Sequence, residues 1–239
     1  MGISNELITD GVFDGIRRGR WATDAEFKNI WHKRPGVVIG RGPNDDYKRF
    51  QAVAQFAGKR IGCNTAFRAY LNLDAIVWMD YEIFRDHKEE MRHLKCYKFA
   101  VNPVTYRTYG IDIIGLKAMR PERCSDSIES GFYPCNLTGY VGTNLALIMG
   151  LDPVWLHGFD SNYKDPMMRK RVDQFAYIAD WCRQNDRHVY IATEGSYLER
   201  FFEHKKLPGS GEKRLRARKK GVNCDDMGNR GEITMSAAI

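Results

Sequence analysis

The sequence predicts an α/β fold in which helices cover both faces of a doubly wound, mostly parallel sheet. Short apolar segments rich in β-branched residues alternate with longer segments of helical period, and this alternation is typical of parallel strands joined by crossover helices. Glycine or polar residues follow several of the apolar segments. Because ligands of such sheets bind beyond the carboxyl ends of the strands, where the strand order reverses, we expect a site there.

The first expected unit is a helical N-terminal segment, residues 1–34. Thr23 and Glu26 have the spacing of a capping box, in which the hydroxyl of Thr23 accepts a hydrogen bond from a first-turn N–H and the carboxylate of Glu26 accepts one from the N–H of Thr23. This pattern predicts a helix from Thr23 to about Lys33, which stops before Pro35.

The second expected unit is a domain of alternating strands and helices, residues 35–207. The hydrophobic periods predict strands at 37–39, 59–64, 75–80, 97–101, 154–160 and 189–193, and helices at 47–57, 81–94, 139–149, 166–184 and 197–204. The segment 105–135 is less regular, with an edge strand expected at 111–116 and a loop at 120–132. Its purpose stays open, and a lid over the site is one interpretation.

The composition is that of a globular protein. The chain of 239 residues contains 12 Phe, 12 Tyr and 5 Trp, which excludes a disordered chain and favours one large domain. No apolar run approaches the roughly 20 residues that span a bilayer, and no secretory signal is recognisable. The six cysteines form no CxxC pair, so zinc-ribbon spacing is absent. We therefore expect a protein of the cytoplasm with reduced thiols and no membrane span.

The third expected unit is a basic, flexible C-terminal tail, residues 208–239. The net charge of the chain is +7, and a cluster of Lys and Arg lies at 213–220. Such a cluster suits contact with nucleic acid or with an acidic protein. The alternative is a solvated tail without a partner.

The sharpest local signal is the glycine-rich loop after the first strand of this domain. Gly40, Gly42 and Pro43 would let backbone amides approach a phosphate, and Arg41 adds a positive charge. The loop lacks the third glycine of the dinucleotide motif and the Gly-Lys pair of a P-loop. The alternative interpretation is a tight turn without a ligand.

Polar residues also end the next two expected strands. Asn64 offers a donor and an acceptor that suit a nucleobase or a sugar edge, and Asp80 suits a ribose diol or a metal ion. Taken singly, each could instead cap the helix that follows. Their place in consecutive strands, beside the glycine loop, favours a site.

Two further segments carry candidate residues. Thr138 and Gly139 open a helix, so that they could bind an anion or could serve only as a cap and a close packing contact. His157 lies inside a strand, where a buried, hydrogen-bonded histidine is the simpler interpretation. Asp160 follows at the end of that strand and is better placed to act as a base.

The order of four motifs resembles a known superfamily. Their sequences are VVIGRGPNDD, RIGCNTAF, IVWMDYEIF and LTGYVGTNLALIMGLDPVWLHGFDSN. They are similar to the ordered motifs of a Rossmann-like superfamily that contains bacterial lipooligosaccharide sialyltransferases and the MptE-like hydroxymethylpterin diphosphokinases. The resemblance covers about residues 36–163, and proteins of this superfamily also occur in phage genomes.

The resemblance implies a role for several positions. The residues matched to the nucleotide-binding loop, the nucleotide-contacting Asn, the Ser-Gly turn and the Gly-x-Asp strand end are Gly40, Gly42, Pro43, Asn64, Thr138, Gly139, Gly158 and Asp160. The sequence departs from the family at Arg41 and Asn44, where the family has Asn and Ser. The sialyltransferases also use a histidine downstream of the Gly-x-Asp strand end as base, whereas here the next histidine is His188, which begins the following strand.

Three functional hypotheses follow. The first is a glycosyltransferase-like enzyme that takes a nucleotide sugar as donor, without a metal site, and uses Asp160, Asp80 or His157 as base. The second is an MptE-like diphosphokinase, which alone would need Mg²⁺, held by Asp80 and Asp160. The third is a non-catalytic viral binding or assembly protein, located in the host cytoplasm or the virion, which uses its basic tail.

Overall fold

The computed structural model describes residues 19–40, 47–69, 72–101, 109–119, 123–133, 137–159 and 166–209. The basic cluster of the tail and the residues Arg41, Gly42, Pro43 and Asp160 lie outside these ranges.

Within the described ranges, nine strands form a single sheet, and every pair of neighbouring strands is parallel. The strands are β1 (Arg20–Trp21), β2 (Gly36–Ile39), β3 (Lys59–Cys63), β4 (Ala75–Trp78), β5 (Tyr97–Val101), β6 (Ile114–Leu116), β7 (Val154–His157), β8 (Val189–Ile191) and β9 (Glu203–His204). Their order is β1-β6-β5-β4-β3-β2-β7-β8-β9. The chain thus adds β3 to β6 on one side of β2 and β7 to β9 on the other, so the order reverses between β2 and β7.

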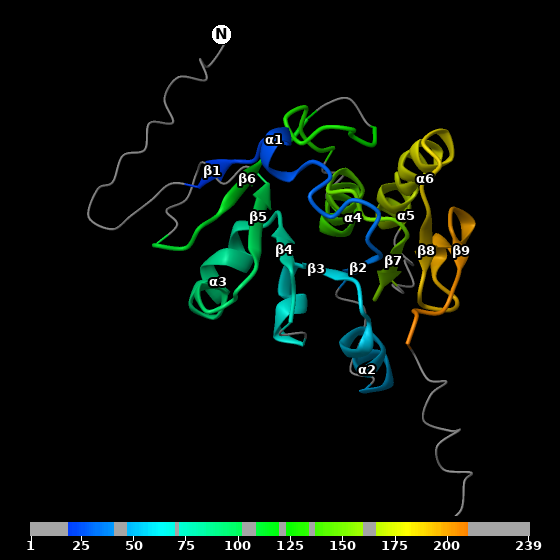
Figure 1. Ribbon diagram of the computed structural model, residues 1–239, viewed down its shortest axis with the longest axis horizontal. Helices are drawn as coiled ribbons and strands as arrows, with labels where there is room; N and C mark the ends of the chain where they lie inside the picture. The colour runs from blue at the N-terminus through cyan, green and yellow to red at the C-terminus, as the bar shows by residue number, and fades with distance from the viewer. Residues whose placement is uncertain are drawn as a thin grey trace, which may run out of the picture.

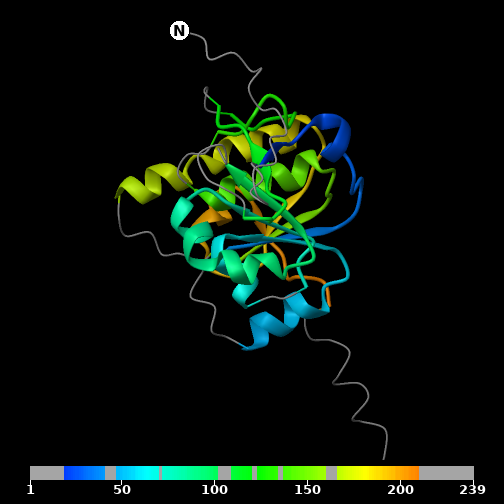
Figure 2. The same cartoon turned by 90° about the vertical axis from the view of Figure 1, so that its left-hand side faces the viewer.

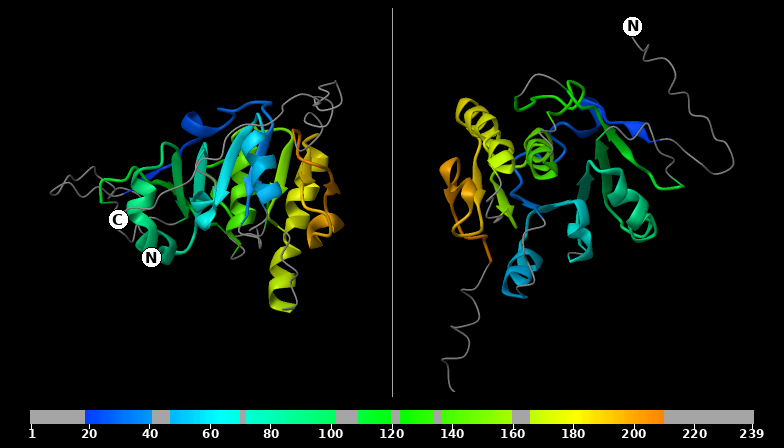
Figure 3. Two further views of the ribbon diagram at one scale, coloured as in Figure 1. Left: turned by 90° about the horizontal axis from the view of Figure 1, so that it is seen from below. Right: turned by 180° about the vertical axis from the view of Figure 1, so that it is seen from behind.

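Helices cover both faces of the sheet (Figure 1). The helices of one face are α1 (Asp24–Phe27), α4 (Thr138–Ile148), α5 (Pro166–Val172) and α6 (Phe175–Gln184). The other face carries α2 (Tyr47–Gln55), the 3-10 helix η1 (Asn64–Arg68) and α3 (Tyr81–Arg92). Figure 2 and Figure 3 show that α5 extends outward past the sheet. This arrangement confirms the predicted Rossmann-like fold.

The central helix, α4, is buried on all sides. It lies across β2, β3, β4 and β7, and ten of its residues are buried. A Cβ on Gly142 would lie 2.8 Å from Sγ of Cys63, so this glycine lets the helix axis approach the sheet closely. The sequence predicted a helix at 139–149, and α4 confirms it within one residue at each end. It contains no charged residue and is buried all round because it forms the centre of the core.

The predicted N-terminal helix is much shorter than expected. α1 ends at Phe27 because Asn29 and Lys33 have φ angles of 60° and 55°, a left-handed conformation that a helix cannot contain. Thr23 is at the N-cap, but its side chain makes no capping bond, and Glu26 accepts a hydrogen bond from Arg20 instead, at 2.5 Å.

Three other predicted elements differ from the structure. The helix expected at 166–184 is two helices, α5 and α6, separated at Asp173, whose carboxylate accepts a hydrogen bond from the Tyr197 hydroxyl at 3.1 Å. The helix expected at 197–204 is a 3-10 turn, η3 (Tyr197–Arg200), followed by strand β9, which pairs with β8. The strand β6 is not an edge strand, because β1 pairs with it.

The described part of the irregular segment is fixed to the core. Cys124, Ile128 and Phe132 are buried. The amide side chain of Asn144 in α4 donates to the carbonyl of Ser125 and accepts from its N–H, both at 2.8 Å. Residues 123–133 therefore form a layer of the fold and not a lid. Among the helices that the structure describes, none has the length and apolar character needed to cross a membrane.

Candidate functional site

The strands β2 and β7 approach each other closely where the strand order reverses. The N–H of Gly40 donates to the carbonyl of His157 at 2.7 Å, and a Cβ on Gly40 would lie only 2.5 Å from the carbonyl oxygen of Gly158. Only glycine fits at this point, because any side chain would separate the two strand ends.

Asn64 lies next to this pair, at the end of β3. Gly62 pairs with Ile39, so Cys63 is level with Gly40 and Asn64 follows it. Asn64 has a φ of 53°, a conformation that asparagine tolerates better than most residues. Its Oδ1 atom is buried and accepts no hydrogen bond from the rest of the protein as described. A buried acceptor without a donor costs about 1–3 kcal/mol, so a ligand that donates here would be stabilised.

The N-terminus of α4 meets the same strand ends. The thiol of Cys63 donates to the carbonyl of Thr138 at 3.9 Å, which places the first turn of α4 beside the end of β3. A Cβ on Gly139 would lie 2.4 Å from the ring of Phe159, the second residue after β7. Gly139 is thus explained by close packing, the alternative that the sequence left open. The first turn of an α-helix presents partly positive N–H groups, so it favours an anion at this edge.

The structure therefore brings four of the predicted residues together. They meet at the carboxyl ends of β2, β3 and β7, joined by the contacts described above. These residues are Gly40, Asn64, Thr138 and Gly139. Asp80 is exposed and precedes α3, two strands away from β2. In the described ranges, no three His, Cys, Asp or Glu residues gather as metal ligands would.

His157 is buried, as the simpler interpretation expected, with 4% of its surface exposed. Trp155 packs on Phe56, on the face of the sheet that α2 covers. His157 lies two residues after Trp155 in the same strand, so it points to that face, which is opposite α4. His188 lies at the start of β8, and its N–H donates to Asp152 at 3.0 Å. His188 therefore lies at the amino ends of β7 and β8, whereas Gly40 and Asn64 follow the carboxyl ends of β2 and β3, so it is poorly placed to act as a base.

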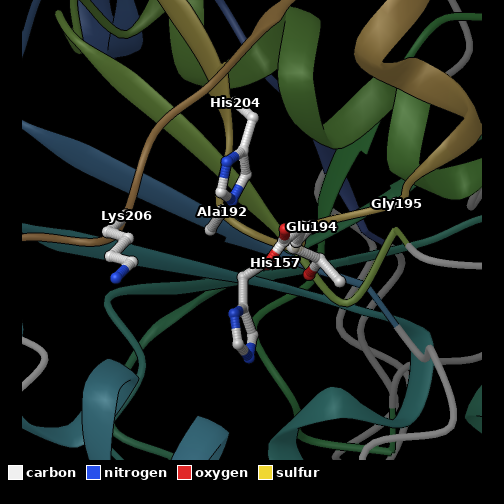
Figure 4. Close-up of a pocket in the computed structure, with 7 residues that line it drawn as sticks. His157, Ala192, Glu194, Gly195, His204 and Lys206 are labelled. Carbon is white, nitrogen blue, oxygen red and sulfur yellow. The ribbon is translucent and has the colours of Figure 1, made fainter.

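A hollow of about 480 Å³ lies beside His157, at the ends of β7, β8 and β9 (Figure 4). Its lining residues are His157, Ala192, Thr193, Glu194, Gly195, His204 and Lys206. His204 was not among the predicted site residues, because the segment around it has the pattern of a short helix. The order Phe202, Glu203, His204 does not alternate apolar and polar residues, so no local signal indicated the strand β9.

The buried thiols are not nucleophiles. Burial raises the pKa of Cys63 and of Cys182 to about 12, and burial also raises the pKa of Cys124. Because the thiolate is the reactive form, Cys63 acts beside Asn64 as a small packing residue.

Comparisons with known proteins give a fold but no family. No family model matches the chain. No curated protein matches it. Among solved structures, the MAf glycosyltransferase from Magnetospirillum magneticum AMB-1 is similar, with a TM-score of 0.59 and 18% identity over 82% of this chain and 36% of that one. The chain shares that fold. It thus spans about a third of the length of MAf.

Two structures of the sialyltransferase CstII are also similar to the chain. The Campylobacter jejuni enzyme in complex with the substrate analogue CMP-3FNeuAc has a TM-score of 0.44 and 11% identity, over 75% of this chain and 89% of that one. Monomeric CstII has a TM-score of 0.46 and 12% identity, over 74% and 89%.

Proposed function

We propose that the chain binds the nucleotide of an activated sugar where β2, β3 and β7 end, and transfers the sugar to an acceptor. The observation that carries this proposal is the buried Oδ1 of Asn64, which has no hydrogen-bond partner in the described ranges and lies beside Gly40 and the first turn of α4. The order of sequence motifs supports it, and so does the fold shared with a glycosyltransferase.

The proposed roles follow the chemistry of each group. Asn64 accepts a hydrogen bond from the base or the ribose of the donor. The first turn of α4, with Thr138 and Gly139, binds the phosphates. Arg41, Gly42 and Pro43, which lie outside the described residues, are proposed to bind them as well. This cluster of donors would stabilise the charge on the departing nucleotide, because the phosphate keeps the electron pair of the bond that breaks.

The base takes the proton of the acceptor hydroxyl as its oxygen bonds to the anomeric carbon. Of the three candidates, Asp160 is outside the described residues and Asp80 is two strands away from β2. His157 is the nearest described candidate, because its backbone bonds Gly40 and its side chain lines the adjoining hollow.

Replacing Asn64 by glycine is the direct test. Glycine keeps the left-handed backbone and removes only the amide side chain, so we expect little change in unfolding temperature and a loss of nucleotide affinity of about tenfold, the value of one good hydrogen bond. Asn29→Gly is the matched control, since Asn29 has a φ of 60° and is exposed near the opposite end of α4. The measurement is a thermal-shift and calorimetry panel of nucleotides and nucleotide sugars.

The same panel separates the other hypotheses. Nucleotide binding that requires Mg²⁺ would favour the diphosphokinase. An intact fold that binds no nucleotide, but binds DNA through residues after Pro208, would favour the viral binding protein. Equal nucleotide affinity in Asn64→Gly and the parent protein would show that nucleotides do not bind at the ends of β2, β3 and β7.

A further inference from the structure

The hollow beside His157 is built from residues that the proposed donor site does not use. Thr193, Glu194 and Gly195 follow β8, His204 is in β9, and Lys206 follows β9. Figure 4 labels Glu194, Gly195, His204 and Lys206 around the hollow, together with His157. Its volume of about 480 Å³ is within the range of small-molecule sites in proteins.

Thr193 lines this hollow, and its hydroxyl has no hydrogen-bond partner among the residues that the structure describes. Only 5% of its surface is exposed, and its Oγ1 atom is buried without a hydrogen-bond partner in the described part of the chain. Buried hydroxyls are nearly always hydrogen-bonded. The partner of this one is therefore expected to be a group that enters the hollow.

The charged groups around Thr193 favour an anion. Lys206 is an exposed ammonium at the rim, whereas the neighbouring Lys205 lies over the ring of Tyr190 at 4.4 Å. The imidazole of His204 adds a further donor. Of the two nearby carboxylates, Glu199 accepts the N–H of Gly195 at 2.6 Å and is not among the lining residues. Glu194 is exposed and is the one carboxylate among the lining residues, against the hydroxyl of Thr193, the imidazole of His204 and the ammonium of Lys206.

We propose that this hollow binds the carboxylate or phosphate group of a small acidic molecule, through the Thr193 hydroxyl, His204 and Lys206. The hollow adjoins the proposed donor site, because the backbone carbonyl of His157 accepts a hydrogen bond from the N–H of Gly40 and His157 also lines the hollow. The acidic molecule is then the acceptor of the sugar, and this part of the inference rests on the proposed function.

Four hexoses test the charge preference on the full chain by calorimetry. Glucuronate carries a carboxylate, glucose 6-phosphate a phosphate, glucosamine an ammonium, and glucose no charge. We expect one or both acidic sugars to bind at least about tenfold more tightly than glucose and glucosamine, as a charge-assisted hydrogen bond would give. The two acidic probes distinguish a carboxylate site from a phosphate site.

Two variants test the residues. Thr193→Val keeps the shape of the side chain and removes the hydroxyl, and Lys206→Gln removes the ammonium. Each is expected to weaken the acidic sugar about tenfold, while the control Lys205→Gln leaves its affinity unchanged. Equal binding of all four sugars, no binding of any, or unchanged affinity in both variants would overturn the inference.

Nucleotide binding, measured on the same proteins, separates this inference from the proposed function. Nucleotides that bind while acidic sugars do not would leave the donor site and remove the second site. Acidic sugars that bind while nucleotides do not would leave an anion site and remove its role as the acceptor site.

Discussion

Replacing Asn144 by leucine is expected to lower the free energy of unfolding by about 3 kcal/mol, because it leaves two buried backbone groups unpaired. Asn144 is fully buried, and its amide pairs with both the N–H and the carbonyl of Ser125. Leucine has a similar size, so the loss comes from the hydrogen bonds and not from a cavity. Urea unfolding, followed by circular dichroism, gives the difference.

Thr143→Val is the control for this prediction. Thr143 is adjacent and equally buried, but its hydroxyl donates to Gly139 within the same helix, at 2.7 Å. Its loss leaves no backbone group of another segment without a partner, so we expect a cost of about 1 kcal/mol. If Asn144→Leu costs no more than Thr143→Val, residues 123–133 are not anchored as described.

Replacing Gly40 by alanine is expected to cost about 3 kcal/mol and to abolish nucleotide binding. The new Cβ would lie 2.5 Å from the carbonyl oxygen of Gly158 and 3.2 Å from the ring of Phe159. Because a backbone oxygen cannot turn aside as a side chain can, the ends of β2 and β7 must separate. The separation would displace the strand ends at which the donor is proposed to bind.

Gly62→Ala is the matched change in the neighbouring strand. There the new Cβ would lie 2.6 Å from Cδ1 of Leu73, the end of a flexible side chain that can adopt another rotamer. We expect Gly62→Ala to cost less than half as much and to keep nucleotide affinity. A larger loss of stability in Gly62→Ala, or full nucleotide binding in Gly40→Ala, would contradict the close approach of the two strand ends.

The sequence predicted the strands that have a strong local signal. The segment expected at 97–101 is β5, with the same bounds, and the segment expected at 37–39 is β2 with one residue added. Every residue of β2 is buried, and its sequence is a continuous apolar run. In β5 the apolar run is Phe99–Val101, which follows the buried Lys98. The two-residue strands β1 and β9 have no such run. They are strands only because they pair with β6 and β8, so the local sequence does not indicate them.

The helix predictions failed where backbone conformation overrode the pattern. The apolar period after Thr23 is real, because Phe27 and Trp31 are both buried. The left-handed conformation at Asn29 nevertheless turns the chain, and the N–H groups of Asn29 and Trp31 donate to the carbonyls of Ile148 and Met149. Hydrogen bonds to the end of α4 cannot be seen in a local sequence window.

The candidate site was predictable to the extent that it depends on strand ends. The rule that ligands bind where parallel strands end selected Gly40 and Asn64, and the structure places them side by side. It did not select Thr193, His204 or Lys206. These residues come together only because β9 returns beside β8, a pairing that the pattern of 197–204 concealed.

The two-residue lengths of β1 and β9 have a consequence for solubility. Among the described residues they are the outermost strands of the sheet, so each edge strand offers another molecule only a short row of backbone N–H and carbonyl groups. Long, flat borders invite fibril-like association between molecules, and very short ones discourage it. The short edge strands thus discourage edge-to-edge association of a wide all-parallel sheet that is open and not a barrel.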